Sequence, residues 1–317
     1  MELDAECEAL KSALKGKEKG DQLTNLVLMK SKRDRLALRE AYNNLYGTDL
    51  LKDLDKALHG NFKKVVIDLF KTPQERDAFY LYKSMKGVGT NDEALVEVLC
   101  SRSNEEIKRI IEEYKKQFND DLERKVSSDT SGNYKKFLIS LLQCQRSENS
   151  VPNDAECKKL AEDLYKAGEG KLGTDEETFH RVFALSSPPE LFSINNFYSQ
   201  LSSRSLTEAV DKEFSGNLKL ALTTILESIL SPPNYYAKRI NKAVKGLGTN
   251  DKMLIRNLIS REGIDMKEIR DAYKNLFGKD MVQDIKEDTS GNYKEFLISL
   301  LQCQRSENSV PNDEECK

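Results

Sequence analysis

The feature that most restricts how this chain can fold is an internal repeat. Residues 131–158 read SGNYKKFLISLLQCQRSENSVPNDAECK, and residues 290–317 repeat them with two changes, Lys136/Glu295 and Ala155/Glu314. The copies are offset by 159 residues, about half of the 317-residue chain. We therefore expect two sequence halves, each made of two modules. The near-identity is most simply explained by duplication and assigns no function.

Short glycine-rich loops recur in three of the modules. They read MKGVGT at 85–90, VKGLGT at 244–249 and, with a different spacing, GEGKLGT at 168–174. Because glycine allows positive φ, such a loop can point several carbonyl oxygens in one direction. Thr90 is followed three residues later by Glu93, and Thr174 likewise by Glu177. This capping-box pattern predicts that a helix begins at each threonine.

An acidic residue follows each loop. Asp129 and Asp288 each lie 42 residues after the first glycine of the K-G-x-G-T loop, ahead of Thr-Ser-Gly, and Glu213 lies ahead of Phe-Ser-Gly. Converging carbonyl oxygens suit a hard cation such as Ca²⁺. Carbonyls leave its charge unbalanced, and these acids supply the missing carboxylate. Alternatively, the glycines are helix C-caps and the acids are solvated surface charges. Three loop-and-acid pairs in register favour the metal site.

A K-G-x-G-T loop with an acid about forty residues later, ahead of a small residue and glycine, resembles the annexin repeat. The resemblance covers nearly the whole chain, as repeats at 5–70, 73–144, 154–230 and 233–304, with a C-terminal tail at 305–317. It implies an all-α fold of about five helices per repeat, packed as a curved disk with the loops on its convex face. Independently of the resemblance, the helical spacing of the apolar residues Ile107, Ile110, Ile111, Tyr114 and Phe118 predicts a helix in repeat two.

The resemblance also implies which residues hold Ca²⁺. In the annexin pattern the cation takes loop carbonyls, one bidentate carboxylate and water. Carried onto this sequence, the ligand sets are Met85, Gly87, Gly89 and Asp129 in repeat two, Gly168, Lys171, Gly173 and Glu213 in repeat three, and Val244, Gly246, Gly248 and Asp288 in repeat four. Since the loop donors are main-chain carbonyls, Val244 in place of the usual methionine is no objection.

Repeat one keeps the helical pattern but not the site. Its loop at 15–21 reads KGKEKGD and lacks the G-x-G-T turn, and its acid position holds Ala57. We therefore expect no Ca²⁺ site in this repeat.

Apolar residues occupy the tips of the other three loops, namely Val88, Leu172 and Leu247. An apolar side chain beside a metal is poorly placed in water, so these residues are predicted to contact membrane. Packing against a neighbouring helix is the alternative.

Composition narrows the class of protein. The net charge of −3 argues against nucleic acid as a main partner. No apolar stretch approaches the 18 residues of a membrane span, and the acidic start without an apolar run predicts no signal peptide. The six cysteines show no CxxC and no metal-ligand spacing. In a chain of this length without an expected signal peptide, they are predicted to be reduced thiols in the cytosol. His59 and His180 are the only histidines and are expected to have structural or surface roles.

These features predict a calcium-dependent binder of anionic phospholipid membranes, cytoplasmic and peripheral on membranes when Ca²⁺ rises. Protein and leaflet are both negative, so the cation would bridge them. The alternative is an annexin-fold scaffold or cytoskeleton-associated protein in which membrane binding is secondary. The alpha-giardins, which are relatives of the annexins, look like proteins of this kind. A cytoskeletal partner and self-association on membranes stay open. An enzyme is not expected, because no nucleophile–base pair, phosphate-binding glycine loop or redox motif is present.

Overall fold

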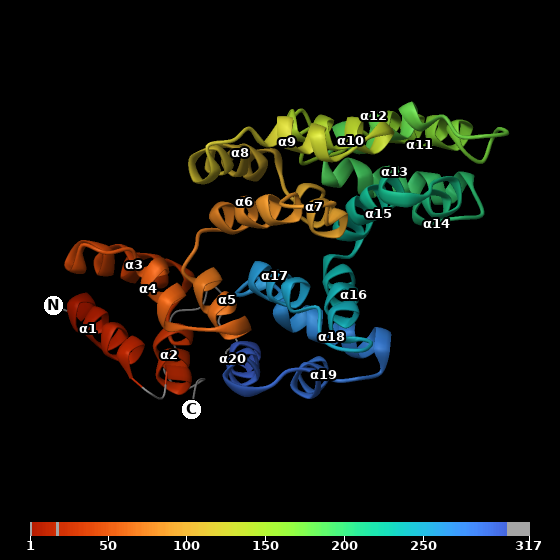
Figure 1. Cartoon of the computed structure of the whole chain (residues 1–317). Helices are drawn as coiled ribbons and strands as arrows, with labels where there is room; N and C mark the ends of the chain where they lie inside the picture. The colour runs from red at the N-terminus through yellow and green to blue at the C-terminus, as the bar shows by residue number, and fades with distance from the viewer. Residues whose placement is uncertain (1, 17–18, 303–317) are drawn as a thin grey trace. The chain divides into compact units, whose positions relative to one another are not determined.

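The computed structural model describes residues 2–16 and 19–302 of the chain (Figure 1). Within those ranges every regular element is an α-helix, which confirms the all-α expectation. Lys17 and Glu18 of the first loop, and the tail at 305–317, lie outside the described residues.

The helices fall into four groups of five, one group for each expected repeat. Repeat one contributes α1 (Glu2–Lys15), α2 (Lys19–Leu28), α3 (Lys32–Tyr46), α4 (Leu50–Ala57) and α5 (Gly60–Leu69). Repeat two contributes α6 (Pro73–Ser84), α7 (Asp92–Leu99), α8 (Asn104–Phe118), α9 (Leu122–Asp129) and α10 (Gly132–Leu142). Repeat three contributes α11 (Asp154–Ala167), α12 (Glu176–Leu185), α13 (Pro188–Leu201), α14 (Leu206–Glu213) and α15 (Gly216–Leu230). Repeat four contributes α16 (Pro232–Val244), α17 (Asp251–Arg261), α18 (Met266–Phe277), α19 (Met281–Asp288) and α20 (Gly291–Gln302).

The helices form two compact units that do not follow the two sequence halves. One unit joins the chain up to Pro73 to the chain from Pro233 onward, so repeat one packs with repeat four. The other unit runs from Gln74 to Pro232 and joins repeats two and three. Each unit has its own apolar core. The duplicated halves are therefore related in sequence, while the cores are shared between repeats of different halves.

The near-identical helices α10 and α20 take corresponding places in the two units. Helix α10 packs against α12 and α15 of repeat three, and α20 packs against α2 and α5 of repeat one. In both cases the partners are the second and fifth helices of the other repeat. Tyr134, Phe137 and Leu138 of α10 are buried, as are Tyr293, Phe296 and Leu297 of α20. The repeated sequence thus builds the same interface twice.

The fourth helix of each repeat is short and ends at the acid position. Helices α4, α9, α14 and α19 each have eight residues, and each begins after a side-chain N-cap. The caps are Asp49, Asp121, Ser205 and Asp280, which satisfy a free N–H of the first turn. Two residues follow each of these helices, the first of them in extended conformation, and the fifth helix then starts at a glycine with φ near 60°. This break fixes where the acid lies relative to the next helix.

No helix among the described residues combines the length and apolarity that crossing a bilayer requires.

Candidate metal centres

Each glycine-rich loop lies between the first and second helices of its repeat and is closed by one main-chain hydrogen bond. The N–H of Asn91 donates to the carbonyl of Ser84 at 2.8 Å, and the N–H of Asn250 donates to the carbonyl of Ala243 at 2.7 Å. In repeat three the N–H of Asp175 donates to Ala167 at 2.7 Å, across one residue more. The extra residue explains why the third loop has a different spacing from the other two.

The loops require glycine where the backbone takes a left-handed conformation with positive φ. Gly87 has φ 105° and Gly89 has φ 81°, Gly246 has φ 121° and Gly248 has φ 81°, and Gly173 has φ 82°. A side chain at these positions would be strained. Gly168 differs, with φ −118°, and a Cβ there would lie 3.4 Å from Cγ of Glu213. The third loop therefore approaches its acid closely at a glycine.

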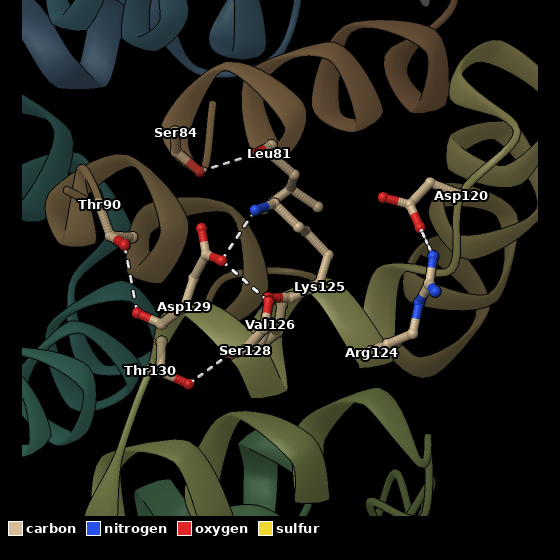
Figure 2. A network of polar contacts seen from close by, with 10 residues as sticks. All are labelled: Leu81, Ser84, Thr90, Asp120, Arg124, Lys125, Val126, Ser128, Asp129 and Thr130. Carbon is tan, nitrogen blue, oxygen red and sulfur yellow. Dashed lines mark hydrogen bonds and ion pairs between the residues drawn. The ribbon is translucent and has the colours of Figure 1, made fainter. Parts of the chain in front are cut away.

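The loop threonines reach across to the acids thirty-nine residues later. Thr174 Oγ1 donates to Oε2 of Glu213 at 2.6 Å, and Thr249 Oγ1 lies 2.6 Å from Oδ2 of Asp288. Thr90 Oγ1 donates instead to the main-chain oxygen of Asp129 at 3.2 Å, as Figure 2 shows. In all three repeats the loop and the acid position are thus joined by a hydrogen bond. Each acidic side chain is half-buried.

The expectation that helices begin at Thr90 and Thr174 is wrong. The N-caps are the next residues, Asn91 and Asp175, whose side chains accept hydrogen bonds from the first turns of α7 and α12. Asn and Asp are strong N-caps, which leaves the preceding threonine hydroxyl free to bond across to the acid position.

In repeat two the carboxylate of Asp129 has further partners on its own helix. Lys125 Nζ lies 2.8 Å from Oδ1 of Asp129, and Ser128 Oγ donates to the same oxygen at 2.9 Å (Figure 2). The acid of this site is therefore held in an ion pair.

In repeat three a second acid fixes the loop. Glu169 accepts hydrogen bonds from Tyr198 at 2.9 Å, from Ser202 at 2.9 Å and from Arg204 at 3.0 Å. Burial raises the pKa of the Tyr198 phenol, and its bond to Glu169 adds to the rise, so the phenol stays a donor. The corresponding loop residue in repeat two is Lys86, whose ammonium lies 5.2 Å from the centre of the Tyr82 ring. The loops of repeats two and three are thus anchored differently.

Repeat one has no carboxylate at the corresponding place. Ala57 ends α4 as Asp129 ends α9, and the following Gly60 has φ 62° as Gly132 has φ 60°. Ala57 therefore lies at the place on α4 that Asp129 occupies on α9.

The loop tips are fully open to solvent. Val88 is 109% exposed, Leu172 is 104% exposed and Leu247 is 108% exposed. Packing against a neighbouring helix is therefore not what these side chains do in this structure.

The donor chemistry in repeats two, three and four fits Ca²⁺. Among the described residues no group of three or more His, Cys, Asp or Glu side chains is gathered for a metal. A site with one carboxylate and several carbonyls needs no such group, and oxygen donors of this kind suit a hard cation. The first expected donor residue is well fixed in repeats two and four, since Met85 is fully buried and Val244 packs against the core. The carbonyl of Gly168 also accepts a hydrogen bond from the N–H of Lys171 at 3.1 Å.

Sequence reasoning missed Lys125 and Glu169. Lys125 precedes Asp129 by one helical turn, a spacing at which oppositely charged side chains meet, so this pair could have been found. The partners of Glu169 lie 29 to 35 residues away, and no local pattern indicates them.

Comparison with known proteins gives a family match over most of the chain. A family model described as Annexin matches residues 4–69, 76–141, 159–225 and 235–300. The chain is 37% identical to annexin A7 of Homo sapiens over 297 residues, which cover 93% of this chain and 61% of that protein. The chain thus spans about three fifths of the length of the first curated relatives it matches.

Solved structures agree with the family model. The structure of annexin III matches with a TM-score of 0.90 at 33% identity, covering 94% of this chain and 93% of that one. A calcium-bound annexin (Sm)1 matches with a TM-score of 0.85 at 28% identity, covering 98% and 91%.

Proposed function

This chain belongs to the annexin family, whose members are calcium-dependent phospholipid-binding proteins, and on that premise we propose that it binds anionic phospholipid membranes through Ca²⁺ held by three of its repeats. The ligands are the carbonyls of the three loops with one acid each. They are Met85, Gly87, Gly89 and Asp129, then Gly168, Lys171, Gly173 and Glu213, then Val244, Gly246, Gly248 and Asp288.

The observation that carries this proposal is the recurring bond from loop threonine to acid residue. It recurs in repeats two, three and four, so loop and acid form one structural element each time. A surface acid with no role would have no reason to meet a glycine-rich loop at the same place three times. The calcium-bound structure of annexin (Sm)1 supports the identity of the cation.

When bound, Ca²⁺ would supply positive charge and open coordination positions for the phosphate or carboxylate oxygens of lipid headgroups. The chain has a net charge of −3, so without a cation it has no overall attraction to an anionic leaflet. The exposed tips Val88, Leu172 and Leu247 would enter the interface beside the headgroups. Three weak sites on one molecule add by avidity. We propose a cytoplasmic protein that becomes peripheral on membranes when Ca²⁺ rises.

Co-sedimentation with phosphatidylserine-containing vesicles tests the proposal. The protein should pellet with vesicles in Ca²⁺ and return to the supernatant with a chelator. A variant combining Asp129→Asn, Glu213→Gln and Asp288→Asn should stay in the supernatant in both.

The control variant removes three exposed acids away from the loops, by Asp55→Asn, Glu105→Gln and Glu268→Gln, and should bind as the wild type does. Undiminished Ca²⁺-dependent binding by the loop-acid variant would refute bridging through these sites. Failure of the wild type to pellet with vesicles in Ca²⁺ as well as in chelator would favour the alternative of a scaffold or cytoskeleton-associated protein.

A further inference from the structure

The acid of repeat two is already paired with a cation of its own helix. Lys125 and Asp129 are one turn apart on α9, and Nζ lies 2.8 Å from Oδ1. The two side chains are 31% and 16% exposed, so the pair is partly shielded from water. In Figure 2 Lys125 is turned toward Asp129, whereas the neighbouring Arg124 is turned toward Asp120.

The other two sites carry no such lysine. The residue four positions before Glu213 is Ala209, and the residue four positions before Asp288 is Asp284. Asp284 accepts a hydrogen bond from the Tyr273 hydroxyl at 2.7 Å. Within residues 2–16 and 19–302, neither Glu213 nor Asp288 forms an ion pair with a basic side chain, and each instead accepts from its loop threonine.

From this asymmetry we infer that Lys125 is an internal counter-ion, which competes with Ca²⁺ for Asp129 and gives repeat two a higher calcium threshold than repeat four. The inference rests on the proposed function. Bidentate binding of a cation needs both carboxylate oxygens, and the ammonium of Lys125 sits on one of them. The lysine must therefore leave, and if it stays nearby it repels the divalent charge.

The hydrogen bond from the loop threonine to the acid residue also differs in repeat two. Thr90 bonds only the main-chain oxygen of Asp129, whereas Thr174 and Thr249 lie against the carboxylates themselves. In repeat two the carboxylate is thus oriented by Lys125 and Ser128 of its own helix rather than by the loop. Releasing Lys125 removes one of these restraints as well as a competing charge.

The test isolates repeat two in the full chain by Glu213→Gln and Asp288→Asn. Direct binding of radioactive Ca²⁺ and the Ca²⁺ concentration for half-maximal sedimentation with phosphatidylserine vesicles are measured in parallel. Adding Lys125→Met should lower both midpoints by about two- to fivefold, the range spanned by a partly exposed ion pair. Lys125→Gln should lower both midpoints in the same way, and Lys125→Arg should keep the midpoints of the parent chain that carries Glu213→Gln and Asp288→Asn.

Arg124→Met is the matched control, since it removes the same charge from the same helix but from the pair with Asp120. Its midpoint should stay close to that of the parent. Equal midpoints for Lys125→Met and the parent, in a protein that still binds Ca²⁺, would overturn the counter-ion role alone. If the wild-type chain binds no Ca²⁺ by either measurement, the proposed function falls and this inference falls with it.

Discussion

Thr249 Oγ1 lies 2.6 Å from Oδ2 and 2.6 Å from the main-chain oxygen of Asp288. The hydroxyl has one proton, so it donates to one of these oxygens at a time. The two residues are separated by thirty-nine positions, and their contact joins the loop before α17 to the end of α19. It holds the carboxylate next to the carbonyls that would share a cation with it.

Thr249→Val should weaken the site of repeat four, because it removes the hydroxyl and keeps the shape. In a chain carrying Asp129→Asn and Glu213→Gln, the Ca²⁺ midpoint for vesicle binding should rise about fivefold, since one hydrogen bond contributes about 1 kcal/mol net. Thr249→Ser keeps the donor and should remain near the parent midpoint. A midpoint that does not move with valine would show that the hydroxyl does not organise this site.

The loop tips should contribute to membrane binding without contributing to Ca²⁺ binding. Val88→Asp, Leu172→Asp and Leu247→Asp together should weaken vesicle binding in salt that screens surface charge, because three charged tips cannot enter an apolar layer. Binding of Ca²⁺ in solution should persist. Val151→Asp, at a residue 79% exposed in the linker between repeats two and three, is the control. Vesicle binding as tight as that of the wild type would mean that the tips stay in water.

Repeat one should remain silent toward Ca²⁺. Ala57→Glu restores an acid at the end of α4, but Lys15 and the rest of the first loop lack the G-x-G-T turn. The carbonyl donors are therefore still missing. In the variant lacking all three loop acids, Ala57→Glu should restore neither Ca²⁺ uptake nor vesicle binding. Measurable Ca²⁺ uptake would show that one carboxylate is sufficient.

His180 should make the unit of repeats two and three less stable in mild acid. Burial lowers the pKa of its imidazole, with Lys136 adding to the shift and Glu177 opposing it. The ring packs 5.4 Å from that of Phe137, and Nε2 lies 2.7 Å from Ser140 Oγ. Because the folded pKa is below the unfolded value of about 6.5, the unfolded chain binds the proton first. The stabilisation is therefore present above about pH 6.5 and is lost as pH falls through the folded pKa.

Denaturant unfolding from pH 8 to pH 5 measures this loss. In the His180→Gln variant the free energy of unfolding should fall less between pH 8 and pH 5 than it does in the wild type. His59→Gln, at an exposed histidine, should follow the wild type. Parallel pH profiles for wild type and His180→Gln would contradict the prediction.

The amino-acid sequence determined the helices and the register of the candidate sites. The spacing of Ile107, Ile110 and Tyr114 predicted α8, and all three side chains are buried. A helix buries residues three and four positions apart, so this information is local and survives in the sequence. The sequence separation from Gly87 to Asp129 equals that from Gly246 to Asp288, and this equality indicated the acid positions. The same alignment of the repeats placed Ala57 at the acid position of repeat one.

Only the tertiary structure decided which partners these elements take. Chain order alone would pair repeat one with repeat two, but Arg35 of repeat one contacts Glu262 of repeat four at 2.6 Å, 227 residues away. The capping-box pattern proposed Thr90 as a cap, but Asn91 takes that role and Thr90 bonds to Asp129. A hydroxyl can form a hydrogen bond with several groups, and a helix face can pack against several other helices. A sequence pattern is compatible with all of these partners and does not indicate which one is used. The packing of the helices selects one of these partners, because it places that partner within contact distance and the others out of reach.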